Sequence, residues 1–338
     1  MNEDKLKNNS SIQKDTLSIF QIAVMTTICV ASLRTLPPMA EEGRASILMY
    51  IIPAILFLIP TSLVSAEFAT TYKGGIYVWI REAFVAIWLQ WIQNVVWYPV
   101  QLAFVAAALA FTINRGDLSN SGLFTAVVII VVYWLSTFLA FKGGNLFAKV
   151  SSIGGMIGVL IPGAILIVLG ILWMAQGQPI SESYLQSSYI PKITGISSLV
   201  LIVSNVLSYA GMEMNAVHAG QMENPKKDFT KAIALAFILI LCVFVFPTLA
   251  IAIAIPADKL GMANGIMVAF QEFFEKLNIS WMSNVISGAM FFGAISSVVT
   301  WVAGPSKGLL DAGKTGLLPP ILQKVNKNNV QVNILVFQ

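Results

Sequence analysis

Charged residues are scarce in this sequence. Asp, Glu, Lys and Arg make up only 11% of its 338 residues, whereas roughly 25% is usual for soluble domains. Hydrophobic residues account for 57% of the chain, and its mean hydropathy is +0.79. This composition excludes an ordinary water-soluble protein and indicates that lipid is the solvent.

Reactive side chains are equally few. There is one histidine, and the two cysteines, Cys29 and Cys242, stand apart inside apolar blocks, which excludes a disulfide framework and a metal-ligand spacing. No nucleophile, metal or cofactor motif is present, so we expect no enzyme activity, no catalytic residue, no cofactor and no metal. The net charge of +4 is scattered and forms no run longer than Lys226 and Lys227, so nucleic acid is not an expected partner.

Long apolar segments are what the sequence has in abundance. A helix needs about 20 residues to cross roughly 30 Å of hydrocarbon. The sequence predicts eight such spans, at residues 17–33 (continuing in broken form to 43), 46–70, 76–112, 122–141, 150–175, 194–220, 231–255 and 283–310.

Both ends of the chain carry a further prediction. Residues 1–16 form a polar tail without a cleavage pattern, so the first span is expected to be retained. A ninth apolar segment begins at Val330 and stops at Gln338. The chain is therefore interpreted as incomplete at its C-terminus, and residues 1–338 alone are not expected to transport.

The distribution of basic residues predicts the orientation. With the N-terminus in the cytoplasm, fourteen Lys and Arg fall in cytoplasmic segments and six remain elsewhere, as the positive-inside rule requires. The fourteen are Lys5, Lys7, Lys14, Lys73, Arg81, Lys142, Lys149, Lys226, Lys227, Lys231, Lys307, Lys314, Lys324 and Lys327.

Two spans contain residues that interrupt a helix. In the first span, Arg34, Pro37 and Pro38 end the apolar block early. In the sixth, Gly211 and Glu213 lie near the centre. Either interruption alone is equally compatible with a simple kink, but a pair of broken helices five spans apart is typical of inverted-repeat transporters, which bind substrate between the half-helices.

Four motifs carry a family resemblance. They are Ser65-Ala-Glu-Phe-Ala-Thr70 with Lys73-Gly-Gly-Ile-Tyr-Val-Trp79, then Leu207-Ser-Tyr-Ala-Gly-Met-Glu213, Asn224-Pro-Lys-Lys-Asp-Phe229, and Trp301-Val-Ala-Gly-Pro-Ser-Lys307 with Leu317-Leu-Pro-Pro320. Because the four motifs occur in this order, the sequence resembles the amino acid-polyamine-organocation transporter superfamily, and most closely its glutamate/γ-aminobutyrate antiporter family.

The resemblance implies an all-α integral membrane protein with a LeuT-like five-plus-five inverted-repeat fold. The tail of residues 1–16 would precede a first repeat at 17–175. The second repeat, at 194–338, would be incomplete, with spans six to eight and the start of a ninth. The implied location is a bacterial inner membrane, which the chain crosses several times. A homo-oligomer is compatible with the sequence.

Candidate substrate-binding groups follow from the two breaks. An amino acid offers an ammonium and a carboxylate, which suit unwound carbonyls and the positive end of a half-helix. We expect the backbone to bind substrate near Val30, Ala31 and Ser32 in span one, and near Tyr209, Ala210 and Gly211 in span six.

Four side chains are further candidates, each with a structural alternative. Arg34 would bind a substrate carboxylate, or would extend to the interface or pair with Glu41 or Glu42. Glu213 would be functional or structural, and is interpreted as functional because an intramembrane carboxylate is costly without a task or a partner. Tyr98, with Trp97 and Gln101, would line a cavity or pack in the core. His218 would sense pH or be a hydrogen-bonded core residue.

The predicted function is therefore secondary transport of an amino acid, as an antiporter of the glutamate/γ-aminobutyrate type. The alternatives are a proton-coupled symporter or uniporter of a neutral amino acid or polyamine, and, in another class, a non-transporting amino acid sensor or an inactive fragment. An amino acid and the lipid bilayer are the expected partners.

Overall fold

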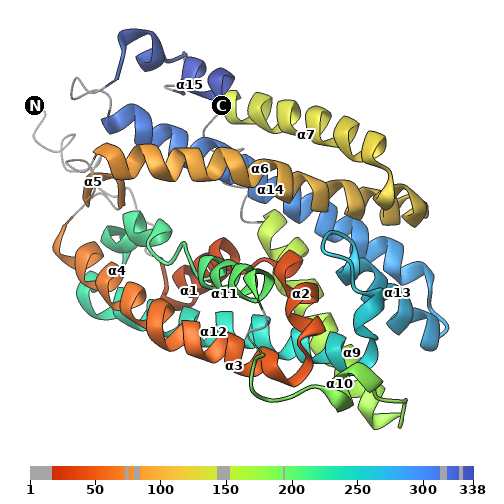
Figure 1. Ribbon diagram of the computed structural model, residues 1–338. Coiled ribbons are helices and arrows are strands. Elements are labelled where there is room, and N and C mark those ends of the chain that lie inside the picture. The colour runs from red at the N-terminus through yellow and green to blue at the C-terminus, as the bar shows by residue number, and fades with distance from the viewer. Residues whose placement is uncertain are drawn as a thin grey trace, which may run out of the picture.

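The computed structural model describes residues 17–72, 76–79, 84–142, 153–192, 195–312, 318–326 and 330–338. Within this part the secondary structure is helical apart from one isolated bridge between Val325 and Gln331 (Figure 1). This confirms the predicted all-α class. The predicted tail, residues 1–16, and the first residues of the Lys73-Gly-Gly motif lie outside the described residues.

Fourteen α-helices and eight short 3-10 or π segments are described, and many of them are pieces of longer, interrupted helices. The α-helices are α1 (Ile19–Val30), α2 (Leu36–Glu41), α3 (Ser46–Pro53), α4 (Ile59–Thr71), α5 (Ile76–Trp79), α6 (Phe84–Thr112), α7 (Gly122–Lys142), α9 (Ile161–Ala175), α10 (Glu182–Gln186), α11 (Ile196–Ser208), α12 (Pro225–Ala254), α13 (Gly265–Lys276), α14 (Trp281–Ala312) and α15 (Val332–Phe337). The short segments are η1 (Leu33–Thr35), η2 (Gly43–Ala45), η3 (Ala54–Leu58), η4 (Gly116–Asn120), η5 (Met156–Leu160), η6 (Met214–Gln221), η7 (Ala257–Lys259) and η9 (Pro320–Gln323).

Six helices of the described part are long and apolar enough to cross a membrane, and the bent pair of Ile19–Val30 and Leu33–Glu41 would make a seventh. The predicted span at 194–220 differs, because α11 has only 13 residues and the rest of the segment is a turn followed by η6. The count of eight therefore stays a prediction, since it treats α11 and η6 as one broken span.

The outer faces of these helices are apolar. Leu56 in η3 is 73% exposed and Leu123 at the start of α7 is 79% exposed. Ile130, Trp134 and Phe138 continue the exposed apolar face of α7. Water would penalise such a surface, whereas lipid tails would not. The arrangement is that of a multi-pass membrane protein.

The helices gather into two groups, which Figure 1 shows one above the other. In one group, α12 packs against α1, α2, α3 and α4, and α11 lies beside α3. In the other, α6 packs along α14, and α7 contacts both. Segments η5 and α9 of span five contact both groups.

Glycine lets span five approach α14 very closely. A Cβ atom on Gly158 of η5 would lie 2.3 Å from the Cα atom of Gly293 in α14, and a Cβ on Gly293 would lie 2.4 Å from the Cα of Gly158. Because both neighbours are backbone atoms, no side chain can move aside. Gly154, one turn earlier, also faces α14, since a Cβ there would collide with Ser296, so the Gly154-x-x-x-Gly158 spacing is a helix-packing spacing.

Candidate functional site

The first helix is interrupted between Val30 and Leu33. Helix α1 ends at Val30. The next residue, Ala31, is extended with ψ 127°, and Ser32 is also extended, with φ −129° and ψ 116°. The chain then re-forms a helix through η1 and α2, and the two halves meet at an angle of 46°. Pro37, which lies within the first turn of α2, lacks the N–H that a continuous helix would need there. The break therefore lies where the sequence predicts it.

The second interruption follows α11. Residues 209–213 form a turn, and η6 begins at Met214. Gly211 has a φ of +116°, a conformation that residues with a Cβ rarely adopt. The glycine thus permits the chain to leave the helix at this point, while Glu213 follows it as a half-buried side chain.

The two interruptions face each other. A Cβ atom on Gly211 would lie 3.4 Å from Cγ2 of Val30 and 3.8 Å from the carbonyl oxygen of Cys29. One turn away, the side-chain amide of Asn215 donates a hydrogen bond of 3.3 Å to the hydroxyl oxygen of Thr26. The structure therefore brings the candidate backbone of span one, at Val30, together with that of span six.

Arg34 lies just beyond the first break, in η1. Its side chain is half-buried, and its Nε is buried without a hydrogen-bond partner. Among the described residues, the ion pairs join Arg115 to Asp117 and Lys259 to Glu272, so neither Glu41 nor Glu42 is paired with Arg34. An arginine that keeps an unpaired buried donor near a helix break is available to an anionic ligand.

Tyr98 lies in the other group of helices. Its hydroxyl donates to the carbonyl oxygen of Trp301 in α14 at 2.9 Å, and its ring lies 5.5 Å from that of Tyr133 in α7. The side chain is 3% exposed. These contacts are those of a packing residue joining α6, α7 and α14, and its predicted contact with substrate stays a prediction.

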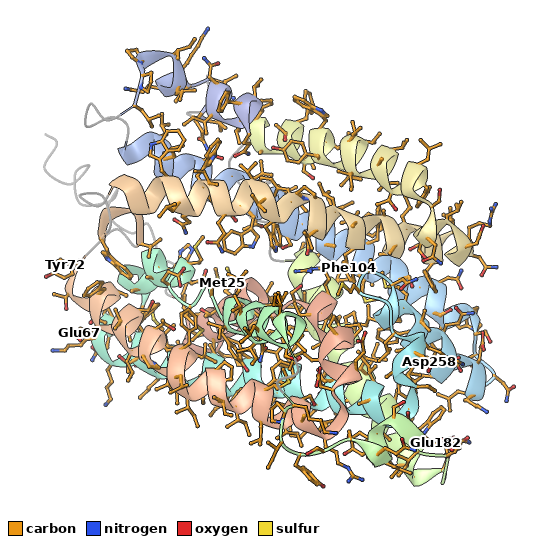
Figure 2. The ribbon with its side chains drawn as sticks, in the orientation of Figure 1. Met25, Glu67, Tyr72, Phe104, Glu182 and Asp258 are labelled. Atoms are coloured by element: carbon orange, nitrogen blue, oxygen red, sulfur yellow. The ribbon has the colours of Figure 1, made fainter. Side chains whose placement is uncertain are left out.

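Met25 and Phe104 mark the region between the two groups, one on α1 and the other on α6 (Figure 2). His218, the pH-sensing candidate, is half-buried in η6. No group of three or more His, Cys, Asp or Glu side chains that could hold a metal ion occurs in the part of the chain that the structure describes.

Sequence reasoning missed the residues that hold the second break in place. Asn205 in α11 and Tyr50 in α3 are buried and contribute hydrogen bonds around Tyr209. The available signal was Pro53, whose missing N–H leaves a carbonyl free one turn earlier in an apolar segment.

Residues 16–338 match a family model described as amino acid permease. The chain belongs to the amino acid permease family. This confirms the resemblance to the amino acid-polyamine-organocation superfamily, and it makes the broken pair of helices part of a membrane transporter.

The sequence is similar to those of three other transporters, with identities between 26% and 40%. An uncharacterised transporter of Legionella pneumophila is 40% identical over 96% of the chain and 71% of its own length. A glutamate/γ-aminobutyrate antiporter of Lactococcus lactis is 30% identical over 95% of the chain and 66% of its own length. A probable agmatine/putrescine antiporter of Lactococcus lactis is 26% identical over 94% of the chain and 68% of its own length. The permease chain thus spans about two thirds of the length of these relatives.

Proposed function

We propose that the protein is an antiporter that exchanges an acidic amino acid, such as glutamate, for a related compound with one carboxylate fewer, such as γ-aminobutyrate. The observation that carries this proposal is the unpaired buried donor of Arg34 beside the break in span one. A second carboxylate is what distinguishes glutamate from neutral amino acids, and it needs a cationic partner where water is scarce. The similarity to a glutamate/γ-aminobutyrate antiporter supports the same assignment.

The proposed site lies between the facing breaks. Carbonyl groups of the unwound backbone would accept hydrogen bonds from the substrate ammonium, and Glu213 would add negative charge on the same side. Arg34 would bind the side-chain carboxylate. The backbone groups proposed for this role are those of Val30, Ala31, Ser32, Tyr209, Ala210 and Gly211.

We also propose that the N-terminus is cytoplasmic. In this orientation the end of the molecule with Glu67 and Tyr72 faces the cytoplasm, and the end with Glu182 and Asp258 faces outward (Figure 2). The exposed Lys226, in the first turn of α12, would then lie at the cytoplasmic surface, as the positive-inside rule requires.

Exchange in liposomes tests the transport proposal. The full-length protein is reconstituted, and uptake of labelled glutamate is measured with γ-aminobutyrate, with putrescine or with no amino compound inside. We expect saturable uptake only with internal γ-aminobutyrate. Uptake without an internal partner that follows an imposed proton gradient would favour the symporter, and exchange driven by putrescine would favour a polyamine carrier. No saturable uptake of any amino compound would favour a sensor.

His218 gives a prediction about pH. We propose that this histidine biases the opening of η6, so His218→Asn should flatten the dependence of the exchange rate on pH. Asn retains hydrogen-bonding capacity but does not titrate. A normally folded variant with the pH profile of the parent would show that His218 has a structural role only.

A further inference from the structure

Two side chains of span six attach the turn that interrupts this span to the neighbouring helix α3. The hydroxyl of Tyr209 donates to the carbonyl oxygen of Tyr50 at 3.0 Å, and the side-chain amide of Asn205, one turn earlier, donates to the carbonyl oxygen of Met49. Tyr209 is fully buried and Asn205 is 3% exposed. These bonds therefore join α11 and the residue that follows it to two adjacent carbonyl groups of α3.

Pro53 explains why one of these carbonyls needs a partner. In an α-helix the carbonyl of Met49 would accept the N–H of the residue four positions later, which is Pro53 and has no N–H. The N–H of Ala54 is taken by the carbonyls of Tyr50 and Ile51. A buried carbonyl without a partner is destabilising, and Asn205 supplies the missing donor. The proline in span two thus creates the attachment point for span six.

Aromatic contacts extend this attachment to α12. The rings of Tyr50 and Tyr209 each lie 5.5 Å from that of Phe244, the first stacked and the second edge-on. The hydroxyl of Tyr50 shares a hydrogen bond of 3.0 Å with that of Thr248. Because all four side chains are fully buried, the end of α11 is fixed relative to two spans.

We infer that Asn205 and Tyr209 are positioning residues for substrate. Their bonds to the carbonyls of Met49 and Tyr50 fix the end of α11, and this holds Gly211 against Val30, where the proposed site lies. The inference rests on the proposed function in so far as it concerns substrate. The attachment itself is a structural statement that can be tested separately.

Hydrogen exchange tests the attachment without any substrate. Asn205→Leu leaves the carbonyl of Met49 buried and unpaired, so the amides of residues 209–213 should exchange about tenfold faster or more. Pro53→Ala restores an N–H to that carbonyl, and the double variant should return close to the parent rate. Asn284→Leu is the matched control, because Asn284 also donates to a backbone carbonyl, that of Phe111, but far from the turn. Failure of Pro53→Ala to rescue would overturn the proline-based part of the inference.

Substrate binding tests the positioning role. Tyr209→Phe keeps the ring and loses only the hydroxyl, and we expect the Kd for glutamate to rise about tenfold. Tyr50→Phe is the comparison variant, since it removes the hydroxyl bonded to Thr248 but keeps the carbonyl that Tyr209 contacts, so Kd should rise much less than in Tyr209→Phe. If the parent protein binds no amino acid, the proposed function is wrong and hydrogen exchange still decides the attachment. If the parent binds and Tyr209→Phe binds equally well, the positioning role is overturned.

Discussion

Replacing Arg34 with alanine should remove the proposed preference for acidic amino acids. We expect the affinity for glutamate to fall about ten- to hundredfold, which corresponds to roughly 1–3 kcal/mol for a charge-assisted hydrogen bond. The affinity for glutamine should change much less, because glutamine has no second carboxylate. Competition of the two amino acids against a labelled substrate, measured on the purified full-length protein, gives both values in one experiment.

Two further arginine variants make this test specific. Arg34→Lys keeps the charge but loses the planar fork that binds a carboxylate through two hydrogen bonds, so its glutamate affinity should lie between those of the parent and the alanine variant. Arg44→Ala is the matched control, because the Arg44 guanidinium lies 5.2 and 5.3 Å from the rings of Tyr184 and Tyr189 and is engaged there. Equal glutamate affinity in the parent and Arg34→Ala would show that Arg34 is only an interfacial anchor.

Alanine at Gly158 or at Gly293 should severely destabilise the fold. Each new Cβ would lie within 2.4 Å of a backbone Cα of the other segment, so η5 and α14 must separate. Overpacking of this kind costs about 1–3 kcal/mol where side chains can adjust, and the upper end or more is expected where only backbone is present. A lower unfolding temperature and loss of monodisperse protein in detergent would measure the effect.

Two other glycines, one in span five and one in α14, serve as controls. A Cβ on Gly163 of α9 would lie 3.5 Å from a methyl group of Leu33, and one on Gly288 of α14 would lie 3.4 Å from a methyl group of Thr112. Both are ordinary contacts, and alanine is favoured over glycine in a helix by up to about 1 kcal/mol. These variants should be neutral or slightly stabilising. If Gly158→Ala unfolds at the same temperature as Gly163→Ala, then span five and α14 do not approach each other as closely as described.

The sequence predicted the interruptions because they depend on local chemistry. Pro37 and Pro38 cannot donate backbone hydrogen bonds, and Gly211 can adopt a positive φ. Each residue therefore disrupts the helix at its own position, which the sequence reveals directly. The long apolar spans were predictable for the same reason. Span six was harder, because the 13 residues of α11 fall short of a full crossing and the rest of the segment is irregular.

The contacts between distant segments were not predictable from one sequence. Nothing near Asn205 indicates that its partner is the carbonyl of Met49, 156 positions earlier. Tyr98 illustrates the opposite problem, since an intramembrane tyrosine fits a cavity or a packed core equally well until its bond to the carbonyl of Trp301 is seen. Facing surfaces are set by tertiary packing, which periodicity and motif spacing do not encode.

The most direct test of the proposed site is a structure of the full-length protein in lipid with glutamate bound. We predict ligand density between the break at Ala31 and Ser32 and the turn at residues 209–211, with the ligand's side-chain carboxylate within hydrogen-bond distance of Arg34. Density that contacts neither break, or an Arg34 side chain that faces lipid while glutamate is bound elsewhere, would contradict the assignment of this protein as an acidic amino acid exchanger with its site between the two broken helices.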